Sequence, residues 1–194
     1  MFNLKLFRIR AFTAGNLASL FSSIGRGGLQ FMLIIWLQGI WLPLHGYNFV
    51  DTPLWAGIYM LPLVAGFLIV GPLSGYLSDR FGARPFATGG MILGAITFVL
   101  LQFLNVNFAY WQFAILIFLN GVGSGLFAAP NSTGIMNSVP AGERGQASGM
   151  RATTMNAGMV LSRGGVFSLM RVGLSSNLPK TMKTQLIAQH VPAA

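Results

Sequence analysis

Apolar and polar residues follow one another along the chain in long blocks. The apolar blocks lie at about residues 12–41, 55–77, 86–104, 110–136 and 146–170. Each block is long enough for an α-helix to cross a hydrocarbon core of about 30 Å, and short polar connectors separate the blocks. The pattern therefore predicts an all-α fold: a polytopic membrane helix bundle (12–170) of about five transmembrane helices, between an arm at 1–11 and a polar tail at 171–194.

The composition agrees with this interpretation. Hydrophobic residues make up 54% of the chain and charged residues only 8%. Soluble domains carry roughly 25% charged residues, so this chain has too few to cover a surface that faces water. The 25 glycines and 16 phenylalanines favour helices that pack closely in lipid. We therefore expect a protein of the lipid bilayer.

The net charge of +9 comes from 12 Lys and Arg residues against 3 acids. A nucleic-acid-binding protein would gather its basic residues on one polar face. Here most of them stand at the ends of apolar blocks, where positive charge sets membrane topology. We therefore expect no nucleic-acid partner. The chain has no cysteine, which excludes disulfides and thiolate metal sites.

The connectors also predict the orientation of the chain. Basic residues occur in the arm and in the second and fourth connectors: Lys5, Arg8, Arg10, Arg80, Arg84 and Arg144. The first and third connectors have none, so the positive-inside rule puts the N-terminus, 78–85 and 137–145 in the cytoplasm. The expected location is the inner (plasma) membrane. The tail then falls outside, although it carries Arg171, Lys180 and Lys183.

The second connector lies in the stretch GPLSGYLSDRFGARP, residues 71–85, and concentrates charge at the end of an apolar block. Gly75 and Gly82 would permit a tight exit from the membrane, and Pro85 suits the first turn of the next helix. Asp79 would cap that helix or lie against the N-terminus of another. The order G-x-L-S-D-R-x-G-x-R is more specific than a simple turn requires.

This order resembles the cytoplasmic-loop signature of the major facilitator superfamily, commonly written G-x-x-x-D-R-x-G-R-R. The matching residues are Gly75, Asp79, Arg80, Gly82 and Arg84, while Ala83 replaces one of the usual basic residues. The resemblance implies that Asp79 helps to latch the outward-open state against the opposite half of a transporter. The motif residues are therefore candidates for gating.

Two further stretches resemble the carboxy-terminal half of the fourteen-span drug:proton antiporters in that superfamily. One is residues 121–162, with R-G-x-A-S-G at 144–149, and the other begins with LFRIRAFTAGNLASLF at residue 6. Such transporters have two six-helix halves that hold substrate between them near the midplane. The resemblance implies secondary transport, with multidrug or small-molecule efflux by alternating access and proton antiport. It also implies a partner, the missing amino-terminal half.

Polar residues inside the apolar blocks are candidates for a substrate cavity, because such residues are costly in lipid and usually face a cavity or a partner. In the first block Arg26 shares a helix face with Asn16, Ser19, Ser23 and Gln30. Arg26 is either a structural arginine bonded to carbonyls of a neighbouring helix or a cavity residue.

The fourth and fifth blocks carry similar residues. Pro130 is expected to break the fourth helix and free carbonyls to line a cavity, although a simple packing kink would explain it equally well. The fifth block has one asparagine at its centre, which would bond a neighbouring helix or a substrate. The complete candidate set is Arg26, Gln30, Asn120, Ser124, Asn131 and Asn156.

Acidic residues are absent from all five blocks, and His45 and His190 lie in a connector and in the tail. Proton coupling normally needs an embedded carboxylate or histidine, so a coupling group would lie in the missing half. No catalytic set, metal-ligand spacing or nucleotide loop is present, so we expect no enzyme activity, cofactor or metal. The alternatives are a facilitator for another polar or anionic solute and a non-transporting truncated membrane protein.

Overall fold

The computed structural model describes the backbone of residues 4–105 and 107–188 and the side chains of 5–105 and 107–172. The described chain is helical and contains no strand, which confirms the all-α prediction. Short 3-10 turns lie at Leu4–Arg8, Phe49–Asp51 and Ala141–Glu143. The α-helices are α1 (Arg10–Trp36), α2 (Leu42–Leu44), α3 (Thr52–Tyr59), α4 (Leu61–Phe81), α5 (Ala83–Gln102), α6 (Tyr110–Asn137) and α7 (Arg144–Ala188), and a π-helical segment (Leu37–Trp41) joins α1 to α2.

Four continuous helical stretches in the described part of the chain are long and apolar enough to cross a membrane. They are Arg10–Leu44, Phe49–Phe81, Ala83–Gln102 and Tyr110–Asn137, which correspond to the first four apolar blocks, although the third ends two residues before its block does. The fifth block, 146–170, lies in α7, which does not reach the same hydropathy, so a fifth span stays a prediction. Helix α7 continues through the first part of the polar tail to Ala188, and His190 lies outside the described residues.

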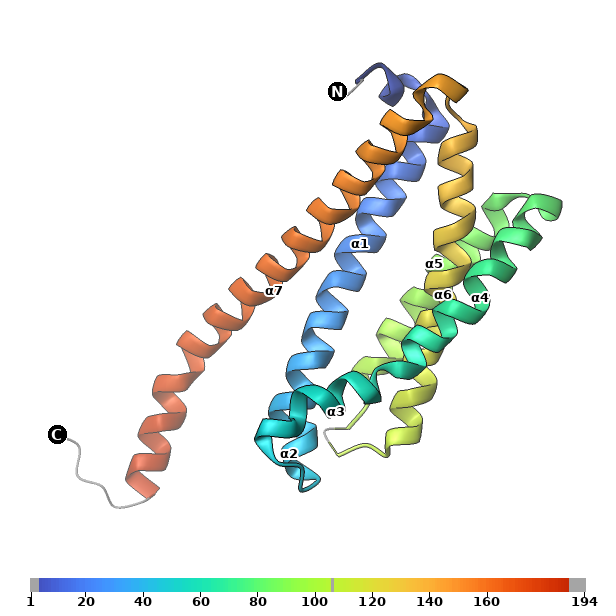
Figure 1. The fold of residues 1–194 in the computed structure, drawn as a ribbon. Coiled ribbons are helices and arrows are strands. Elements are labelled where there is room, and N and C mark those ends of the chain that lie inside the picture. The colour runs from blue at the N-terminus through green and yellow to red at the C-terminus, as the bar shows by residue number, and fades with distance from the viewer. Residues whose placement is uncertain (1–3, 106, 189–194) are drawn as a thin grey trace.

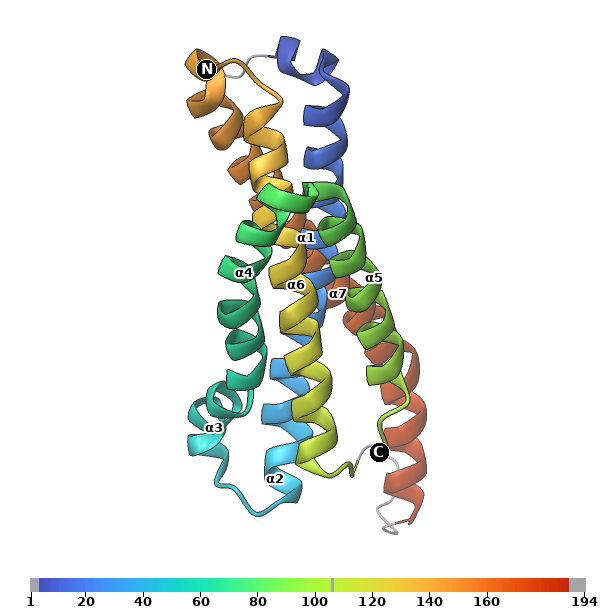
Figure 2. The same ribbon diagram turned by 90° about the vertical axis from the view of Figure 1, so that its right-hand side faces the viewer.

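Helix α6 lies between α4 and α5 and packs against both (Figure 2). Glycines allow the backbones to approach closely on both sides. A Cβ atom on Gly121 would stand 2.9 Å from the Leu63 carbonyl carbon of α4, and one on Gly123 would stand 2.9 Å from the Gly90 carbonyl oxygen of α5. Ser74 of α4 also donates a hydrogen bond to the carbonyl of Gly125, at 2.9 Å. These three helices form one tightly packed unit.

Helix α1 packs along the first part of α7 instead (Figure 1). Gly27 and Gly158 make the crossing possible: a Cβ atom on Gly27 would stand 3.2 Å from the Met159 Cα, and one on Gly158 3.0 Å from the Leu20 carbonyl oxygen. The Ser162 hydroxyl donates a hydrogen bond to a carbonyl of α1. The structure therefore contains a second helix pair beside the three-helix unit.

The two groups of helices meet at both ends of the bundle. At one end a core cluster joins α1 and α6 through aromatic residues, with the Trp36 ring stacked on Phe108 at 4.8 Å between centroids. At the other end Phe12 of α1 and Ile135 of α6 pack with Met150 of α7. The N-terminal arm, the α4–α5 turn and the α6–α7 connector all lie toward this second end (Figure 2).

Candidate functional site

The turn between α4 and α5 is a single residue, Gly82, because α4 ends at Phe81 and α5 begins at Ala83. Gly82 has φ +89°, in a region of backbone space that side-chain-bearing residues rarely adopt. Glycine at this position of the motif is therefore required by the backbone. Pro85 falls in the first turn of α5, as the sequence predicts.

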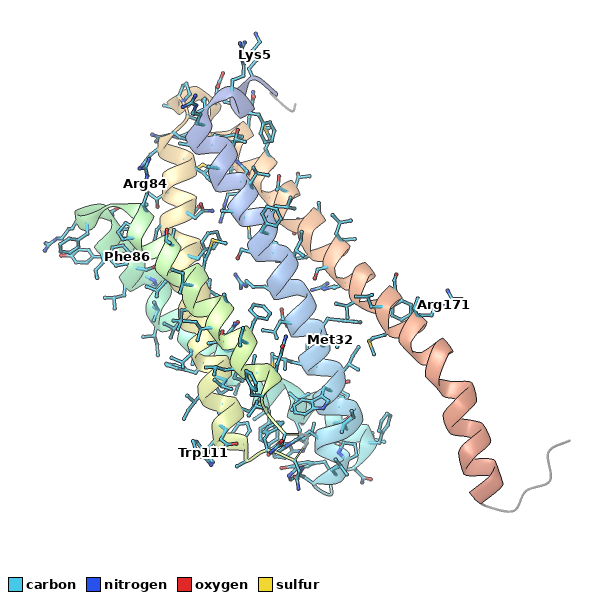
Figure 3. All side chains as sticks on the ribbon, turned by 180° about the vertical axis from the view of Figure 1, so that it is seen from behind. Lys5, Met32, Arg84, Phe86, Trp111 and Arg171 are labelled. Carbon is cyan, nitrogen blue, oxygen red and sulfur yellow. The ribbon has the colours of Figure 1, made fainter. Side chains whose placement is uncertain are left out.

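The charged residues of this turn project into the surroundings. Asp79 makes no capping bond to α5, so the capping alternative is wrong, and its exposed carboxylate pairs with no other described side chain. The Arg80 guanidinium lies 5.0 Å from the Tyr76 ring centroid. Arg84, labelled in Figure 3, is exposed and borders a cavity of about 470 Å³ between α1, α5 and α6. Gly75 faces α6, where a Cβ would meet the Ala129 Cβ at 3.8 Å. The motif thus carries three exposed charges around a one-residue turn.

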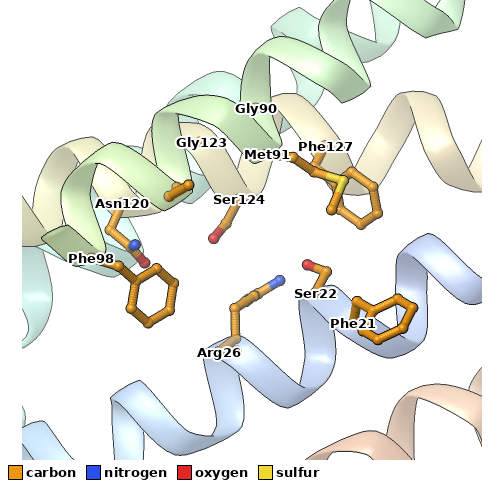
Figure 4. Close-up of a pocket in the computed structure, with 13 residues that line it drawn as sticks. Phe21, Ser22, Arg26, Gly90, Met91, Phe98, Asn120, Gly123, Ser124 and Phe127 are labelled. Atoms are coloured by element: carbon orange, nitrogen blue, oxygen red, sulfur yellow. The ribbon is translucent and has the colours of Figure 1, made fainter.

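A cavity of about 190 Å³ lies between α1, α5 and α6, in the part of the bundle between the two end clusters. Arg26 extends from α1 toward Ser124 of α6, with Ser22 beside it one helical turn away (Figure 4). Asn120 and Ser124 line the opposite wall. The structure therefore brings three of the predicted candidates, Arg26, Asn120 and Ser124, into one cavity.

Arg26 is half-buried near the midpoint of its helix. Its guanidinium carbon lies 5.6 Å from the centroid of the Phe67 ring of α4, within the range of a cation–π contact. Among the described residues it makes no hydrogen bond to a carbonyl of a neighbouring helix and pairs with no carboxylate. The geometry favours the cavity interpretation over the structural one.

Asn120 has a structural bond as well as a place in the cavity wall. Its Nδ2 donates a hydrogen bond to Thr97 Oγ1 of α5 at 2.8 Å, and the Thr97 hydroxyl donates to the Gly94 carbonyl at 2.7 Å. Only 3% of Asn120 is exposed. The amide therefore ties α6 to α5 while it borders the cavity.

Asn131 connects α6 to α1 nearer the end that carries the motif turn. Its Nδ2 donates to Ser19 Oγ at 2.8 Å and to the Gly15 carbonyl at 3.2 Å. It borders a separate cavity of about 470 Å³. Helix α6 runs without a break through Pro130, so the predicted broken helix is wrong. A buried proline removes one backbone bond, and a helix held on both sides tolerates that loss.

The remaining predicted residues lie elsewhere. Gln30 and Asn156 are exposed and line none of the cavities described here. On the same stripe as Arg26, Asn16 donates to the Phe12 carbonyl at 2.9 Å and Ser23 to the Ser19 carbonyl at 2.7 Å. Asn16 Oδ1 is buried without a hydrogen-bond partner. Of the residues on this stripe, only Arg26 lines the cavity.

Sequence reasoning missed the aromatic wall of the cavity, formed by Phe21, Phe98 and Phe127, and the Phe67 ring that contacts Arg26. With 16 phenylalanines in the chain, no local signal separates these from residues that face lipid. Ser22 had a signal, because it stands four residues before Arg26 and so shares its helix face. No cluster of three His, Cys, Asp or Glu side chains that could hold a metal occurs among the described residues.

Several curated proteins are similar to this chain in sequence. The methyl viologen resistance protein SmvA of Salmonella typhimurium is 29% identical over 192 residues, which cover 97% of this chain and 37% of SmvA. The riboflavin transporter RibZ of Clostridioides difficile is 27% identical over 82% of this chain and 33% of RibZ. The putative multidrug resistance protein MdtD of Cronobacter sakazakii is 31% identical over 68% of this chain and 26% of MdtD.

The chain therefore spans about a third of the length of the curated relatives that it matches. No solved structure matches it. The family model of the Major Facilitator Superfamily matches residues 6–170, which include the motif turn, the cavity and all four apolar helical stretches. The chain belongs to the Major Facilitator Superfamily, a family of membrane transporters.

Proposed function

We propose that this chain is the carboxy-terminal portion of a transporter that exports small molecules across the inner membrane by alternating access. A second helical half would complete the substrate site. The observation that carries the proposal is the cavity with Arg26 in its wall, which lies between α1, α5 and α6, while α1 and α6 meet at the two ends of the bundle. The names of SmvA and MdtD, which refer to resistance, support export rather than uptake.

Proton antiport would complete the mechanism. All three acids of the chain, Asp51, Asp79 and Glu143, lie outside the predicted spans. Each is at a helix end or in a connector. An embedded carboxylate that exchanges protons would therefore have to come from the other half. In this proposal the other half carries the group that couples transport to protons. The half described here contributes polar residues to the wall of the substrate cavity.

The experiment that tests the function uses the full transporter in efflux-deficient bacterial cells. Accumulation of methyl viologen, riboflavin and a fluorescent aromatic carboxylate is measured with and without an uncoupler. We expect the full transporter to lower the accumulation of at least one of the three probes, and the uncoupler to abolish that effect. Unchanged accumulation of all three, with the protein present in the membrane, would refute small-molecule export.

Asp79 provides a residue-level test of the same proposal. Asp79→Asn should lower transport roughly ten-fold or more, the loss expected when a charge-assisted contact of about 1.5–3 kcal/mol with the other half disappears. Asp51→Asn is the matched control, because Asp51 is also exposed and makes no capping bond. If both variants transport normally at equal membrane abundance, Asp79 is only a turn residue.

The orientation is part of the proposal. The positive-inside rule predicts that the end of the bundle with the basic arm and the motif turn faces the cytoplasm. A reporter fused at Gly82 or Gly142 should then be cytoplasmic, and one fused at Tyr47 external. Finding Tyr47 and Gly82 on the same side of the membrane would exclude the span between them.

A further inference from the structure

Arg26 places a positive charge in the cavity, and no described side chain neutralises it. The residue lies near the midpoint of the apolar stretch Arg10–Leu44, too far from either end for its side chain to reach the interface. A cation at this depth is unfavourable unless an anion or several hydrogen-bond acceptors accompany it. In the described structure its close neighbour is the face of the Phe67 ring.

The chain itself supplies no counter-charge. Its three acids are Asp51, Asp79 and Glu143, and all three lie at helix ends or in connectors. The hydroxyls of Ser22 and Ser124 and the amide of Asn120 are the polar groups that share the cavity with Arg26. The Asn120 amide nitrogen already donates to Thr97. Arg26 is thus the one charged residue among those that line the cavity.

A guanidinium with hydroxyls beside it matches the chemistry of an oxyanion. Its planar fork presents parallel N–H donors at the spacing of two carboxylate oxygens. Serine hydroxyls can each donate one further bond to the same group. Figure 4 shows Ser22 and Ser124 on either side of the space into which Arg26 extends. A carboxylate or sulfonate placed there would receive donors from both α1 and α6.

The rest of the cavity suits an aromatic or apolar body. Phe21, Phe98 and Phe127 line it together with Met91. Phe98 also borders a cavity of about 390 Å³ toward the aromatic end of the bundle, and Met91 and Phe127 border the cavity of about 470 Å³ on the other side. A ligand with its anionic group at Arg26 has largely apolar space on both sides for its remaining atoms, with Arg84, Thr88 and Asn131 as polar exceptions in the second of these cavities.

We propose that this cavity binds small aromatic anions, with the carboxylate or sulfonate at Arg26, and that such anions are substrates of the transporter. The statement that such anions are transported rests on the proposed function. The statement that they bind in the cavity does not depend on it. The proposal names a substrate class that none of the relatives' names mentions. The binding can be measured separately from transport, on the purified full transporter in nanodiscs.

The test compares two ligands of nearly the same shape, naphthalene-1-carboxylate and the neutral naphthalene-1-carboxamide. We expect the carboxylate to bind more tightly, by roughly ten- to hundred-fold, the range for a hydrogen bond to a charged group. Arg26→Gln should remove this preference, and Arg26→Lys should retain part of it. Arg163→Gln is the matched control, because Arg163 is exposed on α7 and lines none of these cavities.

Ser124→Ala keeps the test decisive if Arg26→Gln does not fold. It should weaken binding of the carboxylate several-fold and leave binding of the carboxamide unchanged. Equal affinity of the two ligands for the unmodified transporter would overturn the proposal. So would a carboxylate preference that survives Arg26→Gln. If Arg26→Gln lowers thermal stability and the unmodified protein binds no carboxylate, Arg26 pairs with an acidic side chain of the other half and the proposal is wrong.

Transport then separates this inference from the proposed function. Cells with the full transporter should accumulate less naphthalene-1-carboxylate, and Arg26→Gln should abolish that difference. Export of methyl viologen or riboflavin that depends on Asp79 while the carboxylate is neither bound nor exported would refute only the substrate class. Binding of the carboxylate without export of any probe would refute only the transport function.

Discussion

Helix α6 has two kinds of partner, and the difference between them accounts for the cavity. Against α4 and α5 it packs backbone to backbone, through Gly121, Gly123 and Gly125. Against α1 it packs at the two ends, through the clusters around Phe113 and Ile135. Between these ends lies a cavity lined by polar and aromatic side chains.

The physical reason lies in the residues that each helix contributes. In lipid no hydrophobic driving force brings helices together, so close van der Waals packing of small residues supplies much of the stability. Helices α4, α5 and α6 place glycines opposite one another and form a rigid unit. Helix α1 places its glycines Gly27 and Gly28 against α7 and presents Arg26 toward α6, so the middle of the α1–α6 contact cannot close.

The largest effect should come from breaking the glycine packing. In Gly121→Leu the new side chain would begin with a Cβ 2.9 Å from the Leu63 carbonyl carbon, with no flexible neighbour to yield. We expect at least the destabilisation of about 1–3 kcal/mol that overpacking causes in cores. Loss of folded protein in a detergent-based thermal unfolding assay would measure it.

Gly71→Leu is the control for this variant. Gly71 lies on α4 in the same unit, and a Cβ there would meet nothing within 4 Å. Its unfolding temperature should stay close to that of the unmodified protein. Equal destabilisation by Gly71→Leu and Gly121→Leu would show that the close approach of α4 and α6 does not determine stability.

A smaller effect is expected for Asn131→Leu, which removes the two bonds from α6 to Ser19 and Gly15 of α1. Hydrogen bonds between membrane helices contribute about 0.6 kcal/mol on average, so the total loss should be about 1 kcal/mol. Asn137→Leu, at the exposed end of α6, is the matched control. Chemical unfolding of the two variants in parallel would measure the difference in their free energies of unfolding. A larger loss for Asn131→Leu than for Gly121→Leu would show that the α1–α6 contact contributes more stability than the glycine packing of α6 against α4.

The smallest effect should follow from locking the rigid unit. The chain has no cysteine, and a Cβ at position 75 would lie 3.8 Å from the Ala129 Cβ, within the separation of about 3.5–4.5 Å that a disulfide needs. The double variant Gly75→Cys, Ala129→Cys should form this disulfide, and its transport in the full transporter should be the same before and after reduction, because α4 and α6 move together. Reduced transport that dithiothreitol restores would show that these two helices move relative to each other.

Some details of the site could be predicted because they depend on neighbours in sequence. The glycine at position 82 follows from a turn of one residue, and its positive φ has the structural role that the motif suggested. Pro130 shows the opposite case. Its sequence predicts a break, but burial between packed helices holds α6 continuous through it.

The polar stripe on α1 shows the same limit. Helical periodicity put Asn16, Ser19 and Ser23 on one face of the helix, and the structure buries all three. It could not say that Gln30, on the same predicted face, would be exposed. Exposure depends on where α6 and α7 cross α1, and no pattern within α1 contains that information.

By itself the sequence determined the all-α fold, the first four apolar helices and the turn of the motif, because segment hydropathy and local backbone geometry depend on residues near each other in the chain. Only the tertiary structure decided which polar residues share a cavity. Arg26, Asn120 and Ser124 come together because glycines draw α4 and α5 onto α6 and draw α1 onto α7. The space left between these two groups depends on contacts between residues that are about a hundred positions apart, as between Asn131 and Ser19.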